Sequence, residues 1–267
     1  MLSMNSRRLN RALLFGFAIS VSLAGAPACR GQAAKTDAHP SASAAAPAAN
    51  ALPTTVPAVT ANSASREQTN IFRDVPEKID ARARYLFYLH GRIIEDRGVR
   101  PVHERHGVYE YQKILETFGG AGFSVISEPR AKDTDVVQYA AKVVAQINAL
   151  IKAGVAPGRI TVVGASKGSG IAMYVSSLLK HRDVNFVIMA GCGEQTLKNA
   201  ALNLYGRVLS IYDASDEGPG TCESLFARSE GLNKRRELKI NLGLGHGFLY
   251  RPYPKWIDPV IEWAKQP

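Results

Sequence analysis

Short runs of apolar residues recur along the chain, with helix-like segments between them. The runs are rich in Val, Ile, Phe and Tyr and are bounded by glycines, which is typical of buried strands. The predicted strands span residues 85–89, 123–127, 160–163, 186–189, 208–212 and 237–242. Because continuous hydrophobic runs indicate strands that are covered on both faces, the pattern predicts a parallel sheet.

The segments between these runs are predicted helices. They span residues 109–118, 135–153, 167–179, 194–203, 221–229 and 254–264. Strands that alternate with helices predict an α/β fold, with helices on both faces of the sheet. In such sheets, functional sites form at the carboxyl ends of the strands. The residues that follow each predicted strand are therefore the candidates for function.

Residues 1–28 have the pattern of an export signal. Three arginines within the first 11 residues precede an apolar stretch over residues 12–26, which is too short to span a membrane comfortably. Small residues at Ala26 and Ala28 fit cleavage after Ala28, which would leave Cys29 first in the mature chain. Two interpretations remain open: lipid modification of Cys29 as a membrane anchor, or plain secretion with a free or discarded cysteine.

Residues 29–65 are predicted to form a disordered linker. They consist mainly of Ala, Pro, Ser and Thr and offer too little apolar surface to offset the entropy of ordering. Such a linker would let a domain stand off a membrane, and a low-complexity leader without that role is the alternative. The folded domain is then expected over residues 66–267.

Composition and charge exclude several classes of protein. A chain of 267 residues with 46% hydrophobic residues can form one globular domain with a sizeable core. The net charge of +10 is partly in the leader, and no dense block of Lys and Arg follows, so we expect no nucleic-acid partner. Three cysteines without a CxxC pair indicate neither a disulfide scaffold nor a zinc site. We expect no cofactor and no metal.

A Gly-x-Ser-x-Gly motif joins the predicted strand 160–163 to the predicted helix 167–179. Its residues are Gly164, Ala165, Ser166, Lys167 and Gly168. The glycines allow a sharp turn, because a Cβ at either position would collide with the neighbouring strand and helix. The turn would expose the Ser166 hydroxyl and place the Lys167 backbone N–H at a helix start. We interpret Ser166 as a nucleophile. The alternatives are a turn without chemistry or a phosphate loop, which would need a glycine directly before Lys167.

A histidine and two aspartates follow the last predicted strands. A serine nucleophile needs an imidazole to accept its proton and a carboxylate to orient that imidazole. His246 lies between glycines in an expected open loop, and a surface histidine without a role is the alternative. Asp216 is the favoured acid. Asp213 is the alternative acid or a brace of the turn, and Glu194 is a third candidate.

The order Ser166, Asp216, His246 resembles that of the α/β-hydrolase family, over nearly all of residues 84–267. The matching motifs are the Gly-x-Ser-x-Gly turn, Leu89-His90-Gly91, Asp216-Glu217 and Gly245-His246-Gly247-Phe248. The resemblance implies a trimmed α/β-hydrolase fold with about six mostly parallel strands, helices on both faces and no large lid.

The resemblance also implies roles for individual residues. The backbone N–H groups of Arg92 and Lys167 would form the oxyanion hole, and His90 would brace the oxyanion loop. The implied activity is a carboxylesterase-like serine hydrolase that cleaves an ester-like acyl bond of a small molecule through an acyl-enzyme. A peptidase with the same triad and a non-catalytic binding module are the alternatives. These residues indicate neither the acyl and leaving groups nor an oligomeric state.

Cys192 and Cys222 follow adjacent predicted strands at the same end of the sheet. Their Cα atoms could therefore lie within bridging distance, and an oxidising compartment after export would allow a disulfide. Two buried thiols are the alternative. A disulfide here would help to hold the loop that carries Asp216.

Residues 92–107 form an unusually long connection between a strand and a helix. The charged and histidine side chains in it are Arg97, Arg100, His103, Arg105, His106, Glu95, Asp96 and Glu104. One interpretation is a basic rim that selects anionic acyl or leaving groups, and the other is a solvated loop with internal salt bridges. A metal site at the two histidines would need a third ligand, and none is evident.

Overall fold

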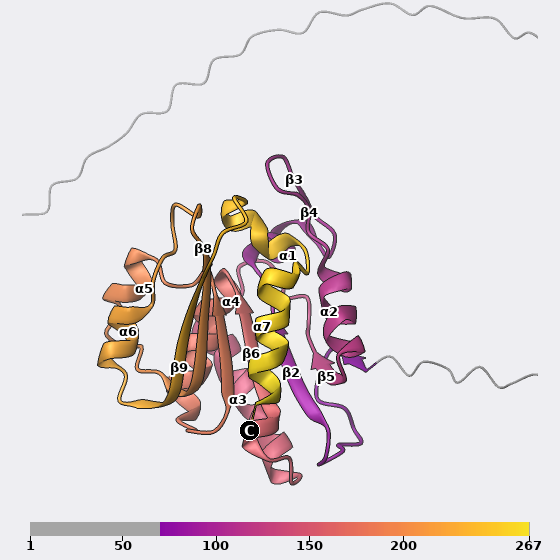
Figure 1. Cartoon of the computed structure of the whole chain (residues 1–267). Coiled ribbons are helices and arrows are strands. Elements are labelled where there is room, and N and C mark those ends of the chain that lie inside the picture. The colour runs from indigo at the N-terminus through magenta and orange to yellow at the C-terminus, as the bar shows by residue number, and fades with distance from the viewer. Residues whose placement is uncertain (1–69, 267) are drawn as a thin grey trace, which may run out of the picture. The chain divides into compact units, whose positions relative to one another are not determined.

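The computed structural model describes residues 70–266, so the expected signal peptide, the linker and Cys29 lie outside the described residues. Seven strands form one sheet in the order β1-β5-β2-β6-β7-β8-β9 (Figure 1). They are β1 (Ile71–Phe72), β2 (Arg84–Leu89), β5 (Phe123–Ile126), β6 (Ile160–Ala165), β7 (Asn185–Met189), β8 (Tyr205–Asp213) and β9 (Gly231–Ile240). Every neighbouring pair is parallel, which confirms the predicted parallel sheet.

Helices cover both faces of the sheet, as predicted. They are α1 (Arg92–Arg97), α2 (Tyr111–Gly120), α3 (Val136–Lys152), α4 (Lys167–Leu179), α5 (Glu194–Lys198), α6 (Glu223–Arg228) and α7 (Pro254–Lys265). Helices α1, α2 and α7 pack on one face, and α3, α4 and α6 pack on the other. Alternate residues of each strand enter the two cores: in β2, Leu86 and Tyr88 face α2, whereas Tyr85 and Phe87 face α3. Both faces are apolar, and this explains the continuous hydrophobic runs.

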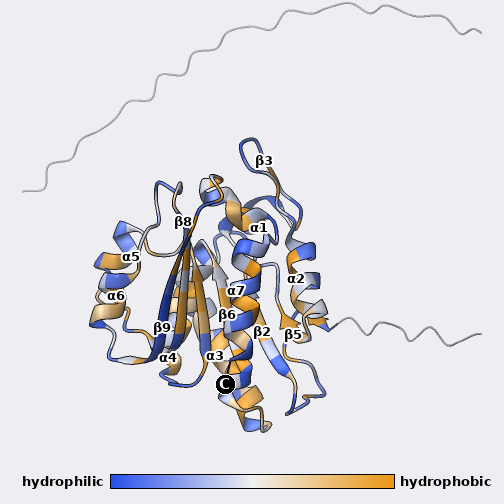
Figure 2. Ribbon diagram, in the orientation of Figure 1, coloured by the Kyte–Doolittle hydropathy of each residue, from blue (hydrophilic) through white to orange (hydrophobic). Residues whose placement is uncertain are grey.

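The edges of the sheet differ from the prediction of about six strands. Strand β1 lies ahead of Arg84 and has only two residues, paired with β5, so it has no apolar pattern to detect. Strand β9 begins at Gly231, ahead of the predicted start at residue 237, and its residues 233–236 are exposed and largely charged. Figure 2 shows β9 as a largely hydrophilic strand. Charged side chains on an edge strand are compatible with pairing on one side only and discourage pairing with another chain.

Two predicted segments also differ in their secondary structure. Helix α5 ends at Lys198 rather than residue 203, and the Arg228 guanidinium binds the carbonyl oxygens of Leu197 and Asn199 at its end. The expected loop 92–107 contains helix α1 and an antiparallel hairpin of β3 (Val102–His103) and β4 (Gly107–Val108). No helix of residues 70–266 combines the length and apolar character that crossing a membrane requires.

Candidate active site

Ser166 occupies a strained turn between β6 and α4. Its φ of 53° and ψ of −116° lie in a region that residues with side chains rarely adopt. The Ser166 backbone N–H donates to the Met189 carbonyl at 3.0 Å, and its carbonyl accepts from the Ser169 N–H at 2.8 Å. The Ser169 hydroxyl, which is buried, also lies 2.8 Å from the Gly164 carbonyl oxygen. These contacts hold the serine in the sharp turn that the sequence predicts.

The glycines of the motif are required by close packing. A Cβ on Gly164 would overlap the backbone of Gly168 in α4, and a Cβ on Gly168 would overlap the Leu89 carbonyl in β2. The predicted collisions with a neighbouring strand and helix are therefore confirmed. A Cβ on Gly91 would lie 3.6 Å from the Ser166 Cβ, which places the loop after β2 beside the serine.

Asp216 and His246 form a hydrogen-bonded pair. The Asp216 Oδ2 lies 2.7 Å from the His246 Nδ1, and the side chains are 8% and 37% exposed. A proton on Nδ1 would donate to this carboxylate and leave Nε2 as the acceptor. His246 lies in the short helix η2 (Gly245–Tyr250) rather than in the expected open loop, because Phe248 and the two residues after it are buried in the core.

The parallel sheet places the three predicted triad residues at the carboxyl ends of its strands, after β6, β8 and β9. Among the hydrogen bonds of residues 70–266, none joins the Ser166 hydroxyl to His246. Asp216 and His246 are thus paired directly, whereas Ser166 lies at the same end of the sheet because of its turn.

Asp213 is the last residue of β8 and uses both carboxylate oxygens to brace the surrounding loops. Its Oδ1 accepts from the Ser215 N–H at 2.9 Å and from the Ser215 hydroxyl, and its Oδ2 accepts from the Leu242 N–H at 2.8 Å. The Ser215 hydroxyl in turn accepts from the Gly245 N–H at 2.9 Å. Asp213 therefore connects the loop of Asp216 to the segment before His246. The third candidate acid, Glu194, is exposed and pairs with Lys198.

Changing Asp213 to asparagine should lower the free energy of unfolding by about 2 kcal/mol, because an amide NH2 would face backbone N–H donors. Burial raises the pKa of Asp213, but the hydrogen bonds from Ser215 and Leu242 outweigh it and hold that pKa below the ordinary 3.8. The charged form is favoured in the folded state, so its contribution is present above 3.8 and is lost as the pH falls further. Urea unfolding at neutral pH measures the effect. The exposed Asp96→Asn is the control, and equal unfolding midpoints would contradict the brace.

The two expected oxyanion donors lie at helix starts. Arg92 is the first residue of α1, and Lys167 is the first residue of α4. The N–H groups in the first turn of a helix have no carbonyl partner within that helix. Both N–H groups can therefore donate to an anion, and the helix dipoles favour negative charge there.

His90 is buried, and its ring connects the loop after β2 to the segment after β5. Its Nδ1 lies 2.8 Å from the Gly91 carbonyl oxygen, and its Nε2 lies 2.9 Å from the Arg130 backbone nitrogen. Burial, followed by the positive charge of Arg130, lowers the pKa of His90 to about 3. The ring is neutral at physiological pH, and both of its nitrogens are already hydrogen-bonded.

A serine elbow after β6, an acid after β8 and a histidine after β9 of one parallel sheet are the features of a known fold. The chain has the α/β-hydrolase fold. Within residues 70–266 this α/β-hydrolase fold carries only the short helix α5 between β7 and β8, so the expectation of no large lid holds for the described part.

Comparison with known proteins gives structural likeness at low sequence identity. A "Putative Dienelactone Hydrolase" from Klebsiella pneumoniae is 14% identical, with a TM-score of 0.49 over 72% of this chain and 90% of that one. A variant of SOBER1 from Arabidopsis thaliana is 13% identical, with a TM-score of 0.46 over 68% and 98%. A metagenome-derived lipolytic enzyme, LipS or LipT, is 11% identical, with a TM-score of 0.43 over 67% and 91%. No family model and no curated protein matches the chain.

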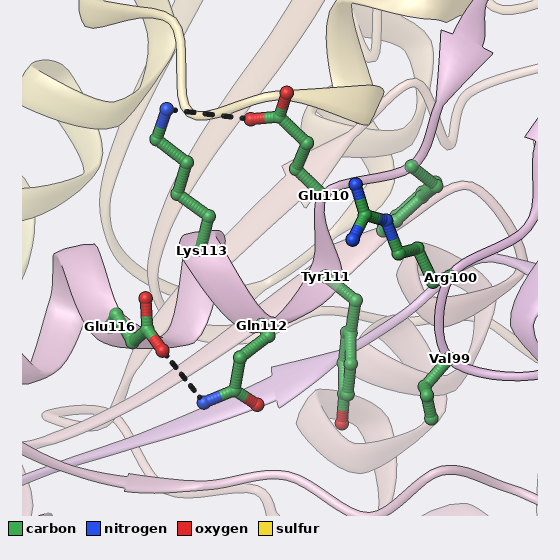
Figure 3. Close-up of a pocket in the computed structure, with 8 residues that line it drawn as sticks. Val99, Arg100, Glu110, Tyr111, Gln112, Lys113 and Glu116 are labelled. Carbon is green, nitrogen blue, oxygen red and sulfur yellow. Dashed lines mark hydrogen bonds and ion pairs between the residues drawn. The ribbon is translucent and has the colours of Figure 1, made fainter. Parts of the chain in front are cut away.

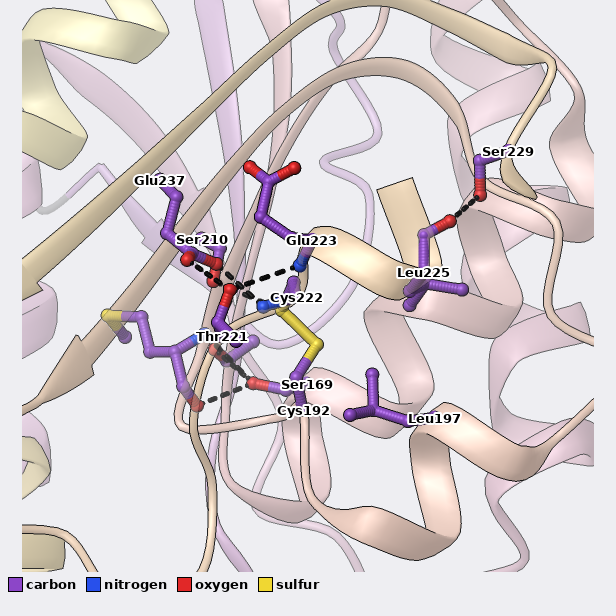
Figure 4. The surroundings of a disulfide bond; sticks show 12 residues. Ser169, Cys192, Leu197, Ser210, Thr221, Cys222, Glu223, Leu225, Ser229 and Glu237 are labelled. Carbon is purple, nitrogen blue, oxygen red and sulfur yellow. Dashed lines mark hydrogen bonds between the residues drawn. A yellow bond between two sulfur atoms is a disulfide. The ribbon is translucent and has the colours of Figure 1, made fainter. Parts of the chain in front are cut away.

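A disulfide joins Cys192 and Cys222, as one of the two interpretations expects (Figure 4). The S–S distance is 2.01 Å, and the Cα atoms lie 5.3 Å apart. The Gly220 N–H donates to the Cys192 carbonyl at 3.1 Å, and the Cys222 N–H donates to Glu237 at 2.6 Å. The loop that carries Asp216 is thereby fixed at its far end to the loop after β7 and to β9.

Replacing both cysteines by alanine should lower the free energy of unfolding by about 3 kcal/mol, because the bond closes a loop of 30 residues in the unfolded chain. Chemical denaturation of the double variant measures this loss. Wild-type protein with a reductant should shift toward the variant, whereas the variant itself should not respond to the reductant. A double variant as stable as the oxidised wild type would contradict the prediction.

The β3–β4 hairpin lies against the segment of His246. The rings of His103 and His106 stack at 4.6 Å, and the His106 ring packs on Tyr250 at 5.2 Å. A Cβ on Gly247 would overlap the His106 ring, so the two segments are in close contact. The pKa of His106 is lowered, first by burial and then by the charges of His103 and Arg105. Among residues 70–266, no three His, Cys, Asp or Glu side chains gather as metal ligands would.

The expectation of internal salt bridges in residues 92–107 is wrong for Glu95. This side chain is buried and pairs outside the segment, with Arg130 and Lys167. These partners are 35 and 72 residues away in sequence, so no local charge pattern indicates them. The sequence therefore gives no sign of this buried cluster of Glu95, Arg130 and Lys167.

A cavity of about 520 Å³ opens beside α2 (Figure 3). It is lined by Val99, Arg100, Tyr109, Glu110, Tyr111, Gln112, Lys113 and Glu116. Its lining includes none of the three triad candidates. Two cationic and two anionic side chains line it, so its charge does not favour an anion, and it gives no support to a basic rim at this position.

Proposed function

We propose that the chain is a serine hydrolase that cleaves an ester-like acyl bond of a small molecule. The observation that carries the proposal is the paired Asp216 and His246 at the sheet edge where Ser166 occupies its strained turn. A carboxylate that orients an imidazole, at the same end of the sheet as a serine on an elbow, fits the arrangement that activates a hydroxyl for attack on a carbonyl.

The proposed reaction has two stages. The His246 Nε2 accepts the Ser166 proton as the hydroxyl attacks the carbonyl carbon, and the backbone N–H groups of Arg92 and Lys167 stabilise the oxyanion. The protonated imidazole then donates to the leaving alcohol, which yields an acyl-enzyme. A water molecule, deprotonated by His246, releases the acid. Asp216 remains ionised and stabilises the imidazolium in both stages.

Turnover of p-nitrophenyl acetate, butyrate and laurate tests this function, with a set of peptide amides measured in parallel. We expect hydrolysis of the short esters, and prior treatment with a fluorophosphonate should abolish it. If the protein hydrolyses the peptide amides but not the esters, the proposed function changes from an esterase to a peptidase. The two classes share this chemistry and differ in pocket contacts. If a folded sample shows no turnover and is not labelled by the fluorophosphonate, the proposal is contradicted, and a binding module is favoured.

We also propose that the protein is exported, with residues 1–28 removed and Cys29 as the candidate site of a membrane anchor. The Cys192–Cys222 disulfide supports this proposal, since such bonds persist in oxidising compartments. The mass of the mature N-terminal peptide tests it. A chain that retains residues 1–28 would contradict export, and an unmodified Cys29 would contradict the anchor.

A further inference from the structure

A buried carboxylate links the two helices that supply the expected oxyanion donors. The Glu95 side chain is 1% exposed and lies on α1, three residues after Arg92. Its Oε2 pairs with the Lys167 Nζ at 2.5 Å, and Lys167 is the first residue of α4. The ion pair of Glu95 and Lys167 therefore links α1 to the start of α4.

The second carboxylate oxygen binds a residue that also holds the oxyanion loop. The Glu95 Oε1 accepts from the Arg130 Nε at 2.8 Å, and the Arg130 side chain is 1% exposed. The same guanidinium donates to the His90 carbonyl, and the Arg130 backbone N–H donates to the His90 Nε2 at 2.9 Å. Glu95, Arg130 and His90 thus join the loop after β2, helix α1 and helix α4 into one unit.

Stability alone gives a poor reason for this cluster. A buried ion pair often contributes no more than well-packed apolar residues of the same size, because its desolvation is costly. What the ion pair supplies is a fixed geometry. Charge-assisted hydrogen bonds at both oxygens hold the Glu95 carboxylate between Arg130 and Lys167 more sharply than apolar contacts can.

We propose that Glu95 is a positioning residue of the oxyanion hole, which sets the Arg92 N–H against the Lys167 N–H. This inference rests on the proposed function of Ser166. Small displacements of donors from the oxyanion cost much of their stabilisation, since such donors act through preorganised geometry. The contact acts through the two backbone donors, and Glu95 itself touches no reacting atom.

The variants Glu95→Gln and Lys167→Met test the proposal. Each should lower kcat for p-nitrophenyl butyrate by about 10- to 100-fold with KM within about threefold, because the donors act mainly on the transition state. The rate constant for fluorophosphonate labelling should fall by the same factor. Glu95→Gln in the Lys167→Met background should add little, since the link is already broken. The exposed Asp96→Asn on the same helix is the matched control and should stay near the wild-type rate.

The direction of the change separates positioning from a simple charge effect. Glu95→Gln removes a negative charge near the expected oxyanion, so a pure field effect would accelerate the reaction, whereas loss of positioning slows it. Lys167→Arg should restore part of the rate, because it can still pair with Glu95.

Folded Glu95→Gln with kcat equal to or above that of Asp96→Asn would overturn the proposal. If Glu95→Gln does not fold, Lys167→Met keeps the Glu95 to Arg130 pair, and a wild-type rate in that variant is equally contrary. Wild-type protein that fluorophosphonate does not label would instead overturn the proposed function itself.

Discussion

Ser166→Ala should lower kcat for ester hydrolysis by about 10⁶-fold, because in the proposed mechanism Ser166 forms the acyl-enzyme and only oxyanion binding remains without it. The folded state should be kept, since alanine adds no atoms to the turn at φ 53°. Initial rates on p-nitrophenyl butyrate, with the thermal midpoint measured on the same sample, give both quantities.

Ser177→Ala is the matched control for this variant. Ser177 lies in the same helix, α4, and its hydroxyl donates only to the Met173 carbonyl and accepts from the Asn203 N–H. Its activity should equal that of wild type. Equal residual activity in the two variants would remove Ser166 from the chemistry.

His246→Ala should lower kcat by about 10⁵- to 10⁶-fold, because the hydroxyl loses its proton acceptor and the leaving group loses its proton donor. Asp216→Asn should cost less, about 10⁴-fold, since the imidazole remains but loses its preferred tautomer and its counter-charge. The His246 side chain is 37% exposed, so its removal should change the thermal midpoint little. Rates and thermal melting of both variants test this order.

His181→Ala serves as the control for the loss of an imidazole, because His181 lies before β7, at the end of the sheet opposite to His246. It should retain full activity. A large fall in the thermal midpoint of His246→Ala, together with the loss of activity, would show that His246 is a packing residue and not a base.

The central part of the fold is predictable from sequence because each inner strand is apolar on both faces. Strands β2, β5, β6, β7 and β8 and the helices α3, α4 and α7 agree with the predicted ranges to within a few residues. The edges are not predictable in this way. Strand β1 has two residues, and β9 carries charged side chains along an edge that meets water on one side.

The candidate site is predictable where a motif is local. The turn at Ser166 depends on two glycines within the motif, so the sequence alone indicates it. The choice between Asp213 and Asp216 depends on how the loop turns after β8, which no local pattern specifies. Glu95 resembles a solvated charge in sequence, because the partners that bury it come from the ends of two other strands.

Mass spectrometry of the protein after treatment with a fluorophosphonate tests the central claim most directly. A single phosphonyl adduct on the peptide that contains Ser166 is the expected result, with a labelling rate that falls by orders of magnitude in His246→Ala. An adduct on another residue, no adduct on folded wild-type protein, or equal labelling rates with and without the imidazole would contradict it.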